Sequence, residues 1–155
     1  MAGESAPPQF GRPDPGVVYR ERPAAFGIAL DDGRIAMVKV TIDGFDPWYD
    51  LPGGAIDPGE VAAEAVVREF GEETGLSIEI GPAFGRGDQY FRMTDGSPVN
   101  NRCTFFEVRL LGFDAGLKIE DDHELVWFEP AAALPRLRHD AHAWAVTAWM
   151  RFHAA

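Results

Sequence analysis

Residues 54–76 read GAIDPGEVAAEAVVREFGEETGL and contain the strongest local structural signal in the chain. Asp57 suits an N-cap, a proline follows it at the first helical position, and Glu60 stands three residues after the cap. Gly75 is typical of the residue that follows the last turn of a helix. The stretch therefore predicts a helix from residue 58 to about residue 74.

The faces of this helix follow from a rotation of roughly 100° per residue. One apolar arc, which we expect to face the core, carries Ala63, Val66, Val67 and Phe70. A neighbouring arc carries the carboxylates of Glu69, Glu72 and Glu73, whereas Arg68 and Glu64 are expected to point elsewhere. Three carboxylates on one arc repel each other, and a hard cation with oxygen ligands would remove the repulsion. The pattern alone fits either a solvated acidic face or a metal site.

The same stretch resembles the box of the Nudix (MutT-like) hydrolases: Gly, five residues, Glu, seven residues, Arg-Glu, an apolar residue, any residue, Glu-Glu, any residue, Gly, apolar. Every fixed position of this pattern is present, and a softer resemblance extends through WYDLPGG at 48–54 and ELVWF at 124–128. The resemblance implies the α/β class, with a Nudix-type α/β/α sandwich around a mixed β-sheet.

The implied activity is a metal-dependent pyrophosphohydrolase that cleaves a nucleoside diphosphate linked to another moiety. Nucleoside triphosphates, dinucleoside polyphosphates and nucleotide sugars all remain open as substrates. The alternative is a catalytically inactive Nudix-fold module that binds nucleotides or regulates another protein. An intact set of box carboxylates argues against this alternative, because a sensor does not need all of them.

The resemblance also implies roles for individual box residues. Glu69, Glu72, Glu73 and the carbonyl oxygen of Gly54 would bind Mg²⁺ or Mn²⁺. Arg68 would pair with Glu60 and hold the preceding loop against the helix. These roles suit the chemistry, since a bound divalent cation neutralises the charge that develops when a diphosphate bond breaks.

We predict that a carboxylate outside the box activates the attacking water, because carboxylates bound to metal are poor bases. Glu124 is the first candidate, since it directly precedes a predicted strand and is better anchored than the middle of its loop. Glu120 is the second candidate, and Glu73 is the alternative inside the box. The acidic run at 120–124 also fits a simple solvated loop.

Aromatic and basic residues outside the box are candidates for substrate contacts. The candidates for stacking on a base are Trp48, Tyr49, Tyr90 and Phe91, although aromatic residues in this number are more often part of a core. Arg86 and Arg92 could meet phosphate. The histidines at 139, 142 and 153 are interpreted as packing or surface residues.

Outside the box, the chain alternates strands and helices, which fits an α/β or α+β class. Residues 1–17 are rich in Pro and Gly and are expected to form an irregular N-terminal arm that packs on the domain or on a second subunit. Residues 18–155 are expected to form a single domain. The predicted strands are 24–30, 34–42, 76–80, 84–92, 102–111 and 125–128, with a final helix at about 139–152.

The chain has 155 residues and a formal net charge of −11, which argues against a long nucleic acid as partner. A small phosphorylated substrate remains possible, because carboxylates can recruit a metal that in turn recruits phosphate. The single cysteine, Cys103, cannot form an internal disulfide. No apolar run is long enough for a membrane span, and the N-terminus does not read as a signal peptide. We therefore expect a cytoplasmic protein with no membrane partner, and a homodimer is left open.

Overall fold

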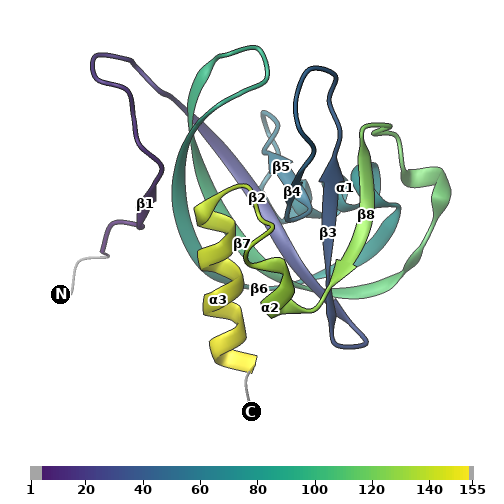
Figure 1. The fold of residues 1–155 in the computed structure, drawn as a ribbon. Coiled ribbons are helices and arrows are strands. Elements are labelled where there is room, and N and C mark those ends of the chain that lie inside the picture. The colour runs from purple at the N-terminus through teal and green to yellow at the C-terminus, as the bar shows by residue number, and fades with distance from the viewer. Residues whose placement is uncertain (1–4, 154–155) are drawn as a thin grey trace.

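The computed structural model describes residues 5–153, and its ribbon is shown in Figure 1. The elements run in the order β1 (Gln9–Phe10), β2 (Arg20–Asp31), β3 (Arg34–Val40), β4 (Trp48–Asp50), β5 (Gly53–Ala55), α1 (Ala62–Thr74), β6 (Leu76–Arg92), β7 (Pro98–Phe113), the 3₁₀ turn η1 (Ala115–Leu117), β8 (His123–Phe128), α2 (Pro130–Ala133) and α3 (Asp140–His153). No helix in the described part of the chain is long and apolar enough to cross a membrane.

The strands form one mixed sheet in the order β1-β6-β7-β2-β3-β4, with β5 added beside β2 and β8 added beside β3. Strands β2 and β7 run parallel, whereas β6 pairs with β7 and β3 pairs with β8 in the antiparallel sense. This mixture of parallel and antiparallel pairs is the mixed β-sheet that the sequence predicted.

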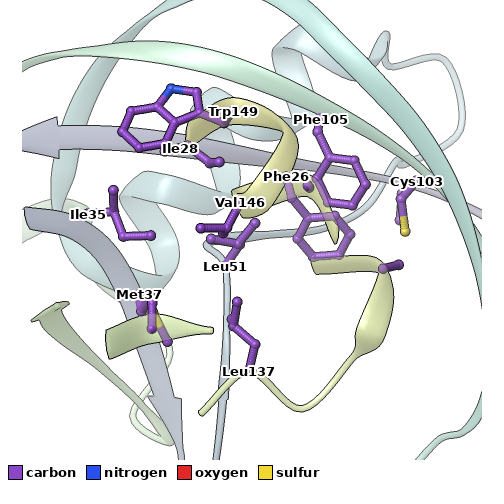
Figure 2. Close-up of a cluster of buried hydrophobic side chains, with 14 residues drawn as sticks. Phe26, Ile28, Ile35, Met37, Leu51, Cys103, Phe105, Leu137, Val146 and Trp149 are labelled. Atoms are coloured by element: carbon purple, nitrogen blue, oxygen red, sulfur yellow. The ribbon is translucent and has the colours of Figure 1, made fainter. Parts of the chain in front are cut away.

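The two faces of the sheet carry separate hydrophobic layers, because successive residues of a strand point to opposite sides. On β2, Phe26 and Ile28 belong to the layer under α3, where they pack with Phe105 and Val146 (Figure 2). The intervening small residues of β2 belong to the layer under α1, which is built around Phe70. Helices α1 and α3 thus cover opposite faces (Figure 1), and the predicted α/β/α sandwich is confirmed.

Helix α1 begins four residues later than predicted, at Ala62, with Val61 as its N-cap. The Pro58-Gly59 pair forms a turn instead, since Gly59 takes a φ of +81° in the left-handed region and the Glu60 amide donates to the Asp57 carbonyl at 3.0 Å. The C-terminal end is as predicted: Gly75 has a φ of +78° and follows the last helical residue.

The predicted core face of α1 was only partly right. Val66 and Phe70 are fully buried, but Val67 is 44% exposed. Ala65, instead of Val67, is buried in the core. The buried arc is therefore rotated toward Ala65 and Glu73, and it carries one of the carboxylates into the interior.

Strand β6 replaces two predicted strands, since its pairing with β7 continues through register shifts around Ile80–Ala83 and Ala83–Gly85. The described part of the N-terminal segment contains a short strand: β1 runs parallel to β6, and the Asp88 amide donates to the Pro8 carbonyl at 2.9 Å. Phe10 packs on Trp144 of α3 with ring centroids 6.1 Å apart. This segment therefore packs on the chain's own sheet.

Candidate functional site

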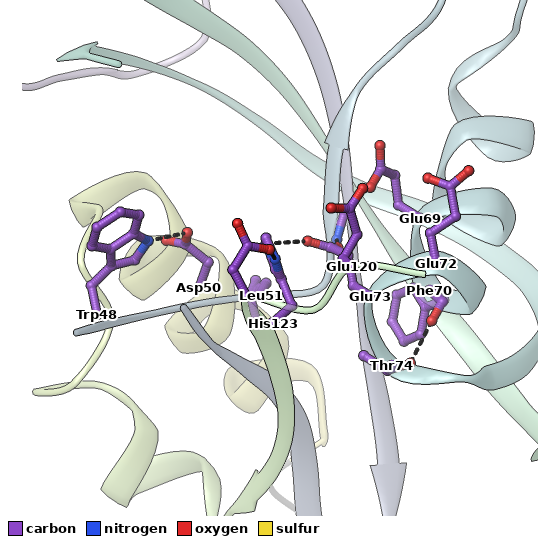
Figure 3. A network of polar contacts seen from close by, with 12 residues as sticks. Trp48, Asp50, Leu51, Glu69, Phe70, Glu72, Glu73, Thr74, Glu120 and His123 are labelled. Atoms are coloured by element: carbon purple, nitrogen blue, oxygen red, sulfur yellow. Dashed lines mark hydrogen bonds and ion pairs between the residues drawn. The ribbon is translucent and has the colours of Figure 1, made fainter. Parts of the chain in front are cut away.

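A cavity of about 300 Å³ lies where α1, β4, β5 and the loop before β8 meet the edge of the sheet. One group of lining residues, here called the acidic side, consists of Glu69, Glu73, Glu120 and His123. A second group, here called the arginine side, consists of Trp48, Asp50, Phe91 and Arg138, and Arg22 also lines the cavity. Figure 3 shows Trp48 and Asp50 on one side of His123 and the carboxylates of Glu69 and Glu72 on the other.

Helix α1 places Glu69 and Glu73 one turn apart at the cavity, beside the backbone of β5. Gly54 is packed so closely on Glu69 that an added Cβ atom would lie 3.1 Å from the carboxylate carbon. A side chain at this position would press on the carboxylate, so glycine favours the close approach of the β5 backbone to Glu69. Burial and the charge of Glu73 raise the pKa of Glu69 to about 7.

Glu73 is a carboxylate held inside the protein, with only 4% of its surface exposed. The Gly53 amide donates to its Oε1 at 2.8 Å, and Nε2 of His123 lies 2.9 Å from its Oε2. Burial raises the pKa of Glu73, although these two partners oppose the shift. The carboxylate is thus fixed from β5 on one side and from β8 on the other.

His123 lies between two carboxylates, since its Nδ1 is 2.7 Å from Oδ1 of Asp122 while Nε2 faces Glu73. Burial alone would lower the pKa of His123, but the hydrogen bonds to Glu73 and Asp122 raise it to about 9. The ring is therefore a cation at neutral pH. With both nitrogens engaged, it offers no free lone pair to a metal. Ligand atoms of Glu120, Asp122 and His123 nevertheless lie within 4.8 Å of one another.

Arg68 lies among the box carboxylates, so the expectation that it points elsewhere was wrong. Its Nε and Nη2 donate to Glu60 at 2.8 and 2.9 Å, and Nη2 also reaches the Ala55 carbonyl at 3.1 Å. Its Nη1 donates to Glu69 at 2.9 Å and to Glu72 at 3.1 Å. The hydrogen bond from Arg68 lowers the pKa of Glu60 to about 2. One guanidinium thus ties the loop before α1 to two carboxylates of the helix.

The acidic side has the donor set that a hard divalent cation requires. Carboxylate and carbonyl oxygens are the ligands that Mg²⁺ and Mn²⁺ prefer, and α1 and β5 supply both kinds next to each other. The raised pKa values of Glu69 and Glu73 show that burial opposes their ionisation. A divalent cation at this position would offset the cost of ionising these carboxylates. The residues on the acidic side therefore fit a divalent-metal site.

The structure places the two candidate bases differently. Glu120 lines the cavity, and its loop is docked on α1 because the amides of Ile119 and Glu120 both donate to the Glu72 carbonyl, at 2.9 and 3.0 Å. Glu124 is exposed and does not line the cavity. It directly follows His123 on β8, and neighbouring strand residues point to opposite faces. The geometry therefore favours Glu120 over Glu124.

Of the predicted substrate contacts, Trp48 and Phe91 line the cavity. Tyr49 packs on Phe128 in the layer under α3, with ring centroids 5.5 Å apart. Tyr90 packs edge-on against Tyr19 at 5.0 Å. The two arginines predicted to contact phosphate do not line the cavity. Arg86 is exposed on β6, and Arg92 forms an ion pair with Asp14 at 2.8 Å.

The arginine side is built around Asp50, whose Oδ2 accepts from Nε1 of Trp48 and from Nη2 of Arg138, both at 3.0 Å. The Arg138 guanidinium lies over the Trp48 ring, 4.4 Å from its centroid, and 5.5 Å from the centroid of Phe91. A cation over an aromatic face is attractive in itself. The cavity wall here is therefore preorganised without a ligand.

Two buried histidines, His139 and His142, complete the cavity beside Arg138. Burial lowers the pKa of His139 to about 2 and that of His142 to about 4, so both are neutral at neutral pH. The Leu51 amide donates to Nδ1 of His142 at 3.2 Å, which places its proton on Nε2. Their interpretation as packing residues agrees with this burial.

Sequence reasoning missed several of these residues, namely Arg22, Asp50, His123 and Arg138. Only His123 carried a usable signal. Strand alternation from Leu125 puts His123, and not Glu124, on the face toward α1. The others come from separate elements, and no local pattern connects them.

A family model described as the NUDIX domain matches residues 20–150. The chain is similar to an ADP-ribose pyrophosphatase of Methanocaldococcus jannaschii, with 32% identity over 130 residues that cover 83% of this chain and 73% of that protein. It is 54% identical to a putative 8-oxo-dGTP diphosphatase of Bacillus subtilis over 61 residues, which cover 39% of this chain and 40% of that protein. Among solved structures, a NUDIX hydrolase from Nitrosomonas europaea superposes with a TM-score of 0.68 at 20% identity, covering 85% of this chain and 90% of that one. At that identity the last likeness shows the fold alone.

Proposed function

The chain belongs to the NUDIX family of hydrolases, and we propose that it cleaves a diphosphate bond of a small nucleotide with the help of a divalent cation. The observation that supports this best is the acidic side of the cavity. There the half-buried Glu69 packs against Gly54, and the buried Glu73 accepts a hydrogen bond from the Gly53 amide. Such a cluster is unfavourable when ionised unless a cation joins it.

The residues that would hold Mg²⁺ or Mn²⁺ are Glu69, Glu72, Glu73 and the carbonyl oxygen of Gly54. When bound, the cation supplies charge neutralisation for the diphosphate oxygens. Arg68 keeps Glu69 and Glu72 in place through Nη1, while its Nε and Nη2 remain on Glu60. His123 and the Gly53 amide orient Glu73 in the same way.

We assign the general base to Glu120. It lines the cavity, and its backbone amide donates to the Glu72 carbonyl of α1, which anchors it there. Glu73 is a poorer candidate, because its two oxygens already accept hydrogen bonds from the Gly53 amide and from the cationic His123. Donors to a carboxylate stabilise its charged form and reduce its basicity.

The arginine side would receive the nucleoside. Trp48 and Phe91 offer aromatic surface for a base, and Arg138 adds a planar cation that Asp50 holds in position. The relatives named as an ADP-ribose pyrophosphatase and a putative 8-oxo-dGTP diphosphatase act on nucleotides that contain a diphosphate. A nucleotide diphosphate substrate suits a cavity with one acidic side and one aromatic, cationic side.

The test is hydrolysis of a panel comprising ADP-ribose, 8-oxo-dGTP, GTP, diadenosine tetraphosphate and a nucleotide sugar, with products identified by mass. We expect two phosphorylated products from at least one compound, with Mg²⁺ or Mn²⁺ present, and no turnover in EDTA. Absence of turnover for the whole panel with either cation would contradict the enzymatic assignment. Full turnover in EDTA would contradict the role of the metal.

A further inference from the structure

Arg22 is a charged residue of the cavity that the proposed function has not used. It lies on β2 and is partly buried. Its Nη1 donates to Oδ1 of Asn101 at 2.9 Å, and within residues 5–153 this is its one protein acceptor. A guanidinium has five N–H donors, so most of its hydrogen-bonding capacity is unused.

The other cations at the cavity have carboxylate partners. Arg138 pairs with Asp50 at 3.0 Å, and His123 pairs with Glu73 at 2.9 Å. Among residues 5–153, no carboxylate forms an ion pair with Arg22. Burial and the neighbouring charge of Arg20 lower the pKa of Arg22. A partly buried cation without a counter-charge is costly, and an anionic ligand would relieve that cost.

The position of Arg22 connects the two sides of the cavity. Its strand continues directly into the pairing of Ala25 with Gly54, the residue that packs on Glu69. On its other flank, Arg22 is in register with Asn101 of β7. Arg22 lines the same cavity as Glu69 of the acidic side and as Trp48 and Arg138 of the arginine side.

We propose that Arg22 binds a phosphate group of the nucleotide substrate and holds the diphosphate between the acidic side and Trp48. This inference rests on the proposed function, since it assumes a phosphorylated ligand in this cavity. A planar guanidinium matches phosphate through two parallel hydrogen bonds, which a lysine cannot reproduce. Asn101 keeps one Nη in place and leaves the remaining donors for the ligand.

The experiment uses inorganic pyrophosphate as the probe, titrated calorimetrically at a fixed Mg²⁺ concentration. Arg22→Met removes the charge but keeps an apolar stem, and Arg22→Lys keeps the charge without the fork. Arg20→Met is the matched control, because Arg20 is an exposed arginine two residues earlier on the same strand and does not line the cavity. Affinity for Mg²⁺ alone is measured for each variant to report on the acidic side and on folding.

We expect Arg22→Met to weaken pyrophosphate binding by about tenfold or more, since a charge-assisted hydrogen bond is worth about that factor. Arg22→Lys should lose several-fold, and Arg20→Met should bind like the wild type. Mg²⁺ affinity should stay within about twofold in all three. If Arg22→Met does not fold, the pyrophosphate affinity of Arg22→Lys alone tests the proposal, and a several-fold loss of that affinity supports it.

Pyrophosphate affinity within twofold of the wild type in both Arg22 variants would overturn the assignment. A parallel loss of Mg²⁺ affinity in Arg22→Lys would also overturn it, because Arg22 would then support the structure. These failures differ from failure of the proposed function, which appears as a wild-type protein that hydrolyses no compound of the nucleotide panel.

Discussion

The two sides of the cavity are built on opposite principles. On the acidic side, carboxylates of like charge are brought together by one helix, and burial raises the pKa of Glu69 and of Glu73. On the arginine side, opposite charges are paired, since Asp50 holds Arg138 and the Trp48 indole. On the acidic side, Arg68 and His123 offset only part of the repulsion, because the pKa values of Glu69 and Glu73 stay raised, whereas Asp50 and Arg138 neutralise each other.

This difference suggests a division of labour. Groups on the acidic side should affect the chemical step and the affinity for metal, because the proposed function puts the metal and the diphosphate bond there. Groups on the arginine side should affect substrate affinity, because they form a preorganised wall. Loss of an interaction made only in the transition state lowers kcat, whereas loss of uniform binding raises KM.

The largest effect is expected for Glu120→Gln, which should lower kcat by roughly 10²–10⁴-fold, the usual contribution of a general base. Glu124→Gln is the matched control on the exposed face of β8, and it should change kcat by less than about threefold. Steady-state kinetics on the preferred nucleotide checks both. A larger loss in Glu124→Gln than in Glu120→Gln would reassign the base.

The next effect is a pH dependence of the metal-free protein, caused by Glu69. Its pKa is about 7 in the folded state and 4.5 as the ordinary value, so the unfolded chain releases this proton first as pH rises. The contribution of Glu69 to stability is therefore lost between about pH 5 and pH 8, by on the order of 2–3 kcal/mol.

Chemical denaturation in EDTA at several pH values, compared between the wild type and Glu69→Gln, isolates this term from the buried histidines. The stability difference between the two proteins should grow with pH in favour of the glutamine variant. At pH 8, Mg²⁺ should stabilise the wild type and so reduce the difference in unfolding free energy between the two proteins. A difference that stays constant from pH 5 to pH 8 would show that Glu69 is not perturbed.

A smaller effect is expected for Arg68→Ala, which leaves Glu60 without its partner and removes the tie to Glu69 and Glu72. We expect a loss of about 1–3 kcal/mol in the free energy of unfolding. Arg109→Ala breaks the exposed ion pair with Glu79 and should cost less than about 1 kcal/mol. Equal unfolding free energies for the two variants would show that Arg68 is an ordinary surface ion pair.

The smallest effect concerns the arginine side. Trp48→Ala should raise KM by about tenfold with little change in kcat, since stacking on a base is worth about 1–3 kcal/mol. Trp48→Phe keeps an aromatic face but loses the hydrogen bond to Asp50, so its KM should lie nearer to the wild type. A fall in kcat at constant KM would place Trp48 with the catalytic groups instead.

The two carboxylates that α1 gives to the acidic side, Glu69 and Glu73, could be predicted from the sequence because they recur at helical spacing. The start of that helix could not, since the turn at Gly59 and the contacts of Glu60 with Arg68 and the Asp57 amide depend on the folded loop. The sequence favours Glu124 over Glu120 because Glu124 adjoins a predicted strand, whereas the direction in which strand residues point supports our proposal of Glu120.

Neither the arginine side nor Arg22 could be predicted from local pattern. Arg22, Asp50 and Arg138 come from β2, β4 and the loop before α3, and only sheet pairing and helix packing bring them together. Tyr49 and Tyr90 looked equally suited to binding a base, but both are engaged in packing. Which aromatic side chains face the cavity depends on which ones pack against other residues, and this follows only from the folded structure.

The division of the cavity is tested most directly by calorimetric titration of Mn²⁺ into the metal-free wild type, Glu69→Gln and Arg22→Met. We expect the wild type and Arg22→Met to bind Mn²⁺ with the same affinity and Glu69→Gln to lose at least tenfold, because a ligand is removed from the acidic side only. No binding to the wild type, or a loss in Arg22→Met that equals the loss in Glu69→Gln, would contradict the account.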